Sequence, residues 1–140
     1  MTTPQRAAPE TIEQYPIWRQ SELLVAVVVD GPPVPKARAR VVNGHTYTPE
    51  RTAGYEALVA WTVREKFPDL TPDGEHEYRI HLTFYLPTHR RADYDNLSKG
   101  ATDALTGIVW RDDSQIADAR VQLMRGCSHP RAEILIWRLI

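Results

Sequence analysis

The segment RRADYDNLSKGATDALTGIVWRDDSQIADAR, residues 90–120, decides which fold this sequence predicts. Apolar residues recur at helical spacing in its centre, and they predict one buried helix face formed by Leu97, Ala101, Ala104, Leu105 and Ile108. Asp95 is expected to be the N-cap of this helix, because a carboxylate there accepts free backbone N–H groups. Asp93 lies just before it, and a turn with a second acidic pair, Asp112 and Asp113, follows the helix.

Strands are predicted before and after this helix in the sequence. Before it, EYRIHLTFYLP (77–87) alternates, so that one side is formed by Tyr78, Ile80, Leu82, Phe84 and Leu86, and Pro87 ends the strand. After it, ADARVQLMR (117–125) places Ala119, Val121 and Leu123 on one face. AEILIWRLI (132–140) predicts a final strand.

The N-terminal half predicts a strand, a loop, a hairpin and a helix. LLVAVVVD (23–30) is short and β-branched, which indicates a buried strand, and the prolines of GPPVPKARAR (31–40) exclude regular structure after it. VVNGHTYT (41–48) predicts a hairpin that turns at Asn43-Gly44. Thr48 is expected to cap the next helix, with Pro49 at its first position. The expected buried face of that helix is Tyr55, Leu58, Val59, Thr62 and Val63.

These elements predict an α+β fold, a single domain with a mixed β-sheet and two main helices packed on it. The chain has 140 residues, which is enough for one domain, and its 42% hydrophobic and 25% charged content is ordinary for a globular protein. Residues 1–20 carry three prolines and little periodicity, so we expect a flexible N-terminal arm there. The domain itself is predicted over residues 21–140.

Several classes of protein are excluded by composition. The longest apolar run, residues 23–29, is far shorter than the roughly 20 residues that cross a bilayer, so no membrane partner is expected. Cys127 is the single cysteine, which excludes an internal disulfide and favours a cytoplasmic location. The five histidines are too scattered in the sequence to form a zinc site.

The net charge of -1 means that binding to DNA would require local clusters of basic residues. Two such clusters are candidate DNA-binding residues, namely Lys36, Arg38 and Arg40 in the proline-rich loop and Arg90 and Arg91 before the helix. The alternation along an extended loop allows the first three side chains to face the same way. A solvated loop, or ion pairs between the two arginines and nearby aspartates, are the structural alternatives.

The acidic residues around the helix suggest a metal site. In an extended segment Asp93 and Asp95 lie on one face, and Lys99 follows one turn later. Like charges oppose each other's ionisation, and a divalent cation removes that penalty. Mg²⁺ prefers carboxylate oxygens, and it can activate water and neutralise phosphate charge. Together with Lys99 as a point charge, the aspartates therefore predict metal-assisted hydrolysis of a phosphodiester.

Each of these residues also has a structural explanation when taken alone. Asp95 can be a helix cap, Asp112 and Asp113 a solvated turn, and Lys99 an exposed helix residue. A calcium loop that begins at Asp93 is excluded, because Ser98 and Ala104 stand where Gly and Glu are required. The metal hypothesis therefore depends on the joint pattern, and it requires the two acidic turns to converge.

The segment DYDNLSKGATDALTGIVWRDDSQI (93–116) resembles the core motif of the RusA-type Holliday junction resolvases, D-x-D-N-L-x-K, D-A-L and W-x-D-D-x-Q. GPPVPKARAR and TYTPERTAGYEALV (46–59) are similar to the proline-rich basic loop and first helix of that family. The resemblance covers roughly residues 24–137. Ala37 and Ala39 depart from the basic loop, where many relatives carry Gly, Arg or Pro.

The resemblance implies a RusA-like fold and a Mg²⁺-dependent, structure-specific endodeoxyribonuclease, for which Mn²⁺ is expected to substitute. Such enzymes act as homodimers on four-way DNA junctions in recombination and repair, and are bacterial or encoded by phages and prophages. Carried over by position, the family motif implies metal binding by Asp93, Asp95 and Asp113. It also implies a catalytic role for Lys99, with Asp112 as an adjacent acidic residue. A two-fold homodimer would supply equivalent sites for paired symmetric nicks.

Two other functions remain open. The first alternative is a non-cleaving branched-DNA-binding module, which clustered negative charge disfavours. A metal-dependent phosphoryl enzyme on small nucleotides is disfavoured by the absence of a P-loop. Trp110 and the apolar last strand are candidates for the dimer interface, although burial in the core is the expected role for most of their residues.

Overall fold

The structure, a computed structural model, describes residues 20–37, 40–47 and 49–140. Except for Gln20, the predicted N-terminal arm lies outside the described residues. The elements follow in the order β1 (Ser21–Asp30), β2 (Arg40–Val42), β3 (His45–Tyr47), α1 (Glu50–Lys66), β4 (Glu77–Tyr85), α2 (Tyr94–Leu105), the short 3-10 helix η2 (Asp113–Gln115), β5 (Ile116–Met124) and β6 (Arg131–Leu139).

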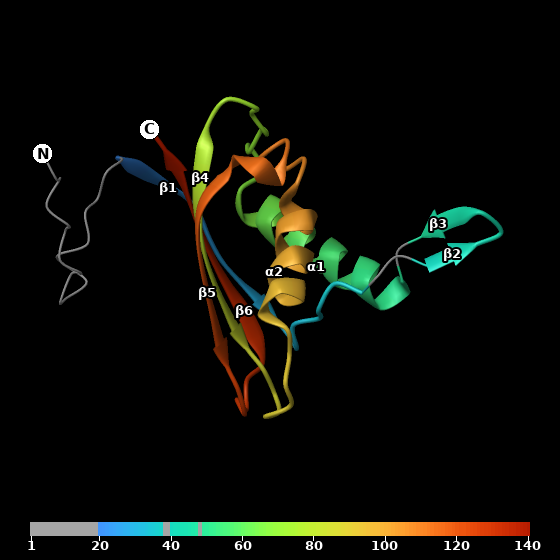
Figure 1. The fold of residues 1–140 in the computed structure, drawn as a ribbon. Coiled ribbons are helices and arrows are strands. Elements are labelled where there is room, and N and C mark those ends of the chain that lie inside the picture. Colours follow the sequence, from blue (N-terminus) through green and yellow to red (C-terminus); the bar gives the residue numbers. More distant parts are fainter. Residues whose placement is uncertain (1–19, 38–39, 48) are drawn as a thin grey trace, which may run out of the picture.

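Four strands form a mixed sheet in the order β1-β6-β4-β5, and Figure 1 shows α1 and α2 on one side of it. β6 is antiparallel to both β1 and β4, whereas β4 and β5 are parallel. Parallel neighbours need a crossover connection, and α2 provides it. The predicted α+β fold, with two main helices packed on a mixed sheet, is confirmed.

The core lies between the sheet and the helices. The predicted inward side of β4 is confirmed, since Tyr78, Ile80, Leu82, Phe84 and the following Leu86 are all buried. The predicted face of α2 is confirmed as well, with Leu97, Ala101, Ala104, Leu105 and Ile108 buried. Burying a large apolar side chain contributes about 1.5–3 kcal/mol. α2 is therefore firmly held, and the acidic turns at its two ends are attached to a rigid element.

Trp110 belongs to the core, as expected. Its side chain is fully buried, and its ring lies 5.6 Å from the ring of Tyr78. Its indole Nε1 donates a hydrogen bond to Thr106 Oγ1 at 3.3 Å. Ile134 and Ile136 of the last strand are also fully buried. Trp110 therefore anchors the connection between α2 and the second acidic turn.

β5 and β1 are the two edge strands of the sheet. On β5, Ala119, Val121 and Leu123 share one face as predicted, since they pair with inward residues of β4. Val121 and Leu123 are half-buried, whereas Ala119 is exposed. On β1, Lys66 Nζ donates to the carbonyl of Ala26 at 2.8 Å. This bond covers part of an edge that could otherwise pair with another strand.

A small hairpin formed by β2 and β3 projects from the rest of the molecule (Figure 1). Its turn is Asn43-Gly44, as predicted, with φ of 52° and 79°. The predicted start of α1 is wrong by one residue, since the helix begins at Glu50 and Pro49 takes the N-cap position. Proline at the N-cap offers no side-chain acceptor, and the predicted cap, Thr48, lies outside the described residues.

The buried face of α1 differs from the predicted one. Three of the five predicted residues are buried, namely Tyr55, Val59 and Val63. Leu58 is 39% exposed, and Thr62 is half-buried with its hydroxyl bonded to the carbonyl of Leu58. Thr52 is buried instead, and its Oγ1 accepts a hydrogen bond from Ala37 N at 3.1 Å. The proline-rich loop covers this end of α1, so the helix is rotated relative to the prediction.

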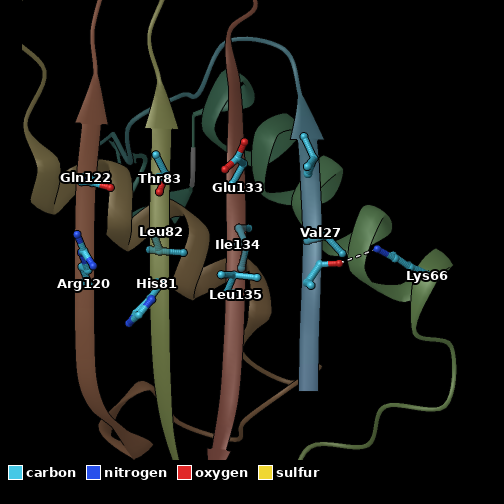
Figure 2. A pocket seen from close by; sticks show the side chains of 12 residues that line it. Val27, Lys66, His81, Leu82, Thr83, Arg120, Gln122, Glu133, Ile134 and Leu135 are labelled. Atoms are coloured by element: carbon cyan, nitrogen blue, oxygen red, sulfur yellow. Dashed lines mark hydrogen bonds between the residues drawn. The ribbon is translucent and has the colours of Figure 1, made fainter. Parts of the chain in front are cut away.

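The face of the sheet opposite the helices is left uncovered by the described residues. Cross-strand register places Ala26 beside Leu135 and Leu135 beside His81 on this face. Val28 and Leu135 are 47% and 36% exposed, and the ring of Trp137 contacts His81 at 4.6 Å. We call Ala26, Val28, Leu135 and Trp137 the open-face patch. Figure 2 shows the hollow on this face, lined by side chains of all four strands.

None of the helices in the described part of the chain is long and apolar enough to cross a bilayer.

Candidate active site

The first acidic pair is located at the N-terminus of α2. Asp93 is the N-cap, and its Oδ1 accepts a hydrogen bond from Asp95 N at 2.9 Å. Its Oδ2 lies 3.4 Å from Asn96 Nδ2. The prediction that Asp95 caps the helix is therefore wrong. Asp93 precedes the first helical residue and can reach the free N–H groups, whereas Asp95 is already inside the first turn.

Lys99 lies one turn further along α2 and contacts two carboxylates. Its Nζ is 3.0 Å from Asp103 Oδ1 and 3.1 Å from Asp113 Oδ2. The two carboxylates raise the pKa of Lys99, with Asp103 the larger influence. Lys99 is therefore a cation at neutral pH, and it links the helix to the second acidic turn.

The second acidic turn is a capped 3-10 helix. Asp112 is its N-cap, and Asp112 Oδ1 accepts a hydrogen bond from Ser114 N at 2.8 Å. This backbone N–H lowers the pKa of Asp112. Asp113 follows at the first helical position, and its carboxylate contacts Lys99. The two adjacent aspartates therefore differ in role, because Asp112 orders the turn and Asp113 points toward α2.

Gln115 holds this turn in place, and the sequence analysis did not identify it as a site residue. Its Oε1 accepts hydrogen bonds from Arg111 N at 2.9 Å and Asp112 N at 3.0 Å. Its Nε2 donates to the carbonyls of Asp73 and His76, both at 2.9 Å. The signal was present in the sequence, since glutamine is the last residue of the W-x-D-D-x-Q motif. Gln115 ties the acidic turn to the loop before β4.

The loop before β4 is itself organised around Asp73. The Asp73 carboxylate accepts hydrogen bonds from Glu75 N, His76 N and Tyr78 Oη at 3.0, 2.8 and 2.7 Å. Burial raises the pKa of Asp73, but these bonds outweigh it and hold the pKa well below its usual range. An aspartate in such an irregular loop has no sequence periodicity that would mark it. Asp73 therefore orders the loop to which Gln115 ties the second acidic turn.

The aspartates have the donor chemistry that a hard divalent cation requires, since all of them present exposed carboxylate oxygens. In the described part of the chain, however, no group of three or more His, Cys, Asp or Glu side chains lies close enough to hold a metal ion. The structure joins the two residues of the first pair through a hydrogen bond from the Asp95 backbone N–H to the Asp93 carboxylate, and it joins Asp113 to Lys99. It does not bring the carboxylates of Asp93, Asp95 and Asp113 into one cluster.

The predicted DNA-binding residues lie in different surroundings. Arg90 and Arg91 are exposed beside Asp93, and neither forms an ion pair with another described residue. Lys36 is ion-paired with Glu56 and Asp103, and its side chain is 24% exposed. Arg38 and the side chain of Arg40 lie outside the described residues. Among the predicted DNA-binding residues whose side chains are described, the arginines before α2 are therefore more available to a phosphate than Lys36.

The segment that carries Arg90 and Arg91 packs against the turn between β5 and β6. Gly126 N donates to the carbonyl of Thr88 at 3.3 Å, and Cys127 N donates to that of Leu86 at 2.8 Å. Gly126 has a φ of 71°, and a Cβ there would lie 2.4 Å from His89 Nε2. A side chain here would be strained by the left-handed φ and would displace the imidazole of His89, so glycine is favoured where the turn meets the basic segment.

The fold and this site define a class of protein, a single-domain α+β protein with exposed aspartates at both ends of one helix and a lysine paired with one of them. Comparison with known proteins identifies the family. Residues 30–137 match the family model described as endodeoxyribonuclease RusA. The chain therefore belongs to the endodeoxyribonuclease RusA family, as its central motif predicted.

Relatives named crossover junction endodeoxyribonuclease RusA come from bacteria and a phage. The Escherichia coli K12 protein is 30% identical over 112 residues, which cover 79% of this chain and 92% of the relative. The protein of Enterobacteria phage 82 is 30% identical over 111 residues, covering 79% and 91%. The Aquifex aeolicus protein is 32% identical over 84 residues, and that match spans 57% of this chain and 65% of the relative.

Proposed function

We propose that this chain is a divalent-metal-dependent endodeoxyribonuclease that cuts four-way DNA junctions by paired symmetric nicks in recombination and repair. The observation that carries the proposal is the contact between Lys99 and Asp113, which joins α2 to the second acidic turn through a cation. The names of the relatives, which are crossover junction endodeoxyribonucleases, support the junction as substrate. Relatives in bacteria and a phage support action in the bacterial cytoplasm.

Asp93, Asp95 and Asp113 are the side chains that would hold the metal, with Mg²⁺ preferred and Mn²⁺ as a substitute. A bound Mg²⁺ supplies a water of lowered pKa and neutralises charge on the phosphate. Lys99, cationic at neutral pH, stabilises the negative charge that develops on the phosphate oxygens. Asp112 stabilises the turn through Ser114 N, so we assign it a supporting role beside the ligands.

Arg90 and Arg91 would bind the DNA backbone next to the scissile phosphate. Both side chains are exposed and adjoin Asp93. Phosphate contacts of this kind position DNA without reading its sequence. Arg38 and Arg40, in the proline-rich segment, are proposed as further phosphate contacts. Lys36 contributes less to DNA binding, because Glu56 and Asp103 already occupy its ammonium group.

The active form is proposed to be a homodimer with two-fold symmetry. A four-way junction has approximate two-fold symmetry, and a matching dimer places two equivalent sites on it. The open-face patch supports this proposal, because Val28 and Leu135 expose apolar surface on a sheet face that the helices leave free. Packing of such a face against its symmetry mate would remove that surface from water.

One competing function is a non-cleaving module that binds branched DNA. A purely binding protein gains nothing from exposed carboxylates beside its basic residues, since they repel phosphates. A second competitor, an enzyme acting on small nucleotides, lacks support because the sequence has no glycine-rich phosphate loop.

The decisive experiment incubates the purified protein with a labelled synthetic four-way junction and with a linear duplex, each with and without Mg²⁺. The proposal expects paired nicks in the junction alone, dependent on Mg²⁺ and lost in Asp95→Asn. Junction binding without cleavage would support the binding module, and hydrolysis of mononucleotides would support the small-substrate enzyme.

A further inference from the structure

Asp103 lies between two lysines that come from different parts of the chain. Its Oδ1 is 3.0 Å from Lys99 Nζ, and its Oδ2 is 3.3 Å from Lys36 Nζ. Lys36 Nζ also contacts Glu56 Oε1 on α1, and Lys99 Nζ contacts Asp113. Five charges of alternating sign therefore run from α1 through the proline-rich loop and α2 to the second acidic turn.

This network is more buried at one end than at the other. The side chains of Lys36, Glu56 and Asp103 are 24%, 22% and 25% exposed. Those of Lys99 and Asp113 are 50% and 47% exposed. Ion pairs shielded from water are screened less by salt and hold their geometry better than exposed ones. The network is therefore anchored at Glu56 and open to solvent at Asp113, where DNA would arrive.

The backbone of Lys36 is held as firmly as its side chain. Lys36 N donates to the carbonyl of Asn96 on α2 at 2.9 Å, and the next amide, Ala37 N, donates to Thr52 Oγ1 on α1 at 3.1 Å. A Cβ on Gly100 would lie 3.3 Å from the carbonyl of Val34, which shows how closely the loop approaches α2. Lys36 is thus fixed between both helices, as expected for a structural cation.

We propose that Asp103 is a positioning residue that holds Lys99 at the cutting site, and that Lys36 and Glu56 keep Asp103 in place. The inference rests on the proposed function, in which Lys99 acts on the phosphate and Asp113 binds the metal. If Asp113 bound the metal instead, Lys99 would lose one of its two acceptors. Asp103 would remain as the second, so the lysine would keep its position on α2.

The test compares single-turnover cleavage and junction affinity for Asp103→Ala and Asp103→Asn in Mg²⁺. We expect the cleavage rate to fall roughly 10- to 100-fold, because misplacing a catalytic group costs about this much, while the Kd for the junction changes less than about twofold. Asp103→Glu should restore part of the rate. Thermal unfolding tests whether each variant is folded. Asp103→Asn is nearly isosteric with the wild type, so it is expected to perturb the fold least.

A double-mutant cycle separates positioning from a general structural effect. If Asp103 acts through Lys99, then adding Asp103→Asn to Lys99→Ala should slow the residual cleavage no further. Glu22→Ala is the matched control, since it removes the 2.9 Å ion pair with Arg138 at the far end of β1 and should leave cleavage unchanged. Lys36→Met should slow cleavage by a larger factor than it weakens junction binding.

The inference is overturned if wild-type protein cuts the junction and Asp103→Asn cuts it equally fast. Full additivity of the Asp103 and Lys99 variants would overturn it too, as would a Lys36→Met variant that binds the junction weakly but cuts it at the normal rate. Absence of cleavage by the wild type would instead refute the proposed function, and the inference would fall with it.

Discussion

Lys99 Nζ and Asp113 Oδ2 lie 3.1 Å apart, although fourteen positions separate the two residues in the chain. The parallel arrangement of β4 and β5 forces the chain to return along α2, and the turn that starts β5 therefore meets the helix. The contact links α2 to the second acidic segment of the motif. Lys99 therefore lies on the side of α2 that faces Asp113, the proposed metal ligand.

Lys99→Ala is expected to slow cutting strongly, with a measurable residual rate, while preserving junction binding. The lysine is proposed to stabilise charge that develops only during the reaction, and losing such a group typically costs roughly 10²- to 10³-fold in rate. Quenched-flow cleavage and gel-shift affinity measure the two quantities separately. Arg64→Ala, which removes an exposed cation from the end of α1, is the control. Weak binding with normal turnover would contradict the role of Lys99.

Gln115→Ala is expected to loosen the second acidic turn. The substitution removes four hydrogen bonds and leaves the carbonyls of Asp73 and His76 without their donor, so we expect a loss of about 1–3 kcal/mol in the free energy of unfolding. Urea unfolding measures it, and cleavage should fall with it. Gln122→Ala, an exposed glutamine further along β5, should change stability by less than about 0.5 kcal/mol. Equal stabilities of the two variants would refute this role.

Asp73→Asn should produce a pH-dependent loss of stability. The pKa of Asp73 is lower in the folded than in the unfolded state, so its ionised form stabilises the fold at pH values above the unfolded pKa of about 4. That contribution disappears as the pH falls toward the folded pKa. We expect a difference of about 1–3 kcal/mol from wild type at pH 7, and a smaller one at lower pH.

Urea unfolding at pH 7, 5 and 3 measures this difference. Asp69→Asn, an exposed aspartate in the same connection, is the control and should stay near wild type at every pH. A difference between wild type and Asp73→Asn that stays constant from pH 7 to pH 3 would show that the hydrogen bonds do not favour the ionised form.

Gly126→Ala is expected to destabilise the protein, because a left-handed φ costs a non-glycine residue roughly 1–2 kcal/mol and the new Cβ collides with His89. Adding His89→Ala should remove the collision and recover part of the loss. Gly54→Ala, in a helix with free space around the glycine, should instead stabilise by about 0.5–1 kcal/mol. Thermal unfolding distinguishes these signs, and a neutral Gly126→Ala would argue against the close packing.

Leu135→Asp should convert the proposed dimer into a monomer, because it places a charge in the centre of the open-face patch. Sedimentation velocity reports the change. Leu58→Asp is a matched control with a similar starting exposure, 39% against 36%, on the outer side of α1. If Leu58→Asp dissociates the dimer instead, the interface lies on the helices. If the dimer survives Leu135→Asp, the open-face patch is excluded as the interface.

Local periodicity predicted the elements that are buried on one side. β4 alternates with period two and α2 repeats near 3.6, and both patterns depend on neighbours in sequence, so the inward residues of each were predicted correctly. The α1 face was predicted less well. There Leu58 is exposed and Thr52 is buried, because the proline-rich loop covers the helix from a side that periodicity does not reveal.

The sequence by itself determined the α+β class, the motif that marks the family and the identity of the charged residues at the site, because these depend on local pattern and residue type. Tertiary structure alone decided which charges meet. Asp93 rather than Asp95 caps α2, Lys36 pairs with Glu56 and Asp103, and Gln115 clamps the loop at Asp73. Side-chain contacts depend on distance in space, and the crossover through α2 is what brings distant parts of the chain within reach of one another.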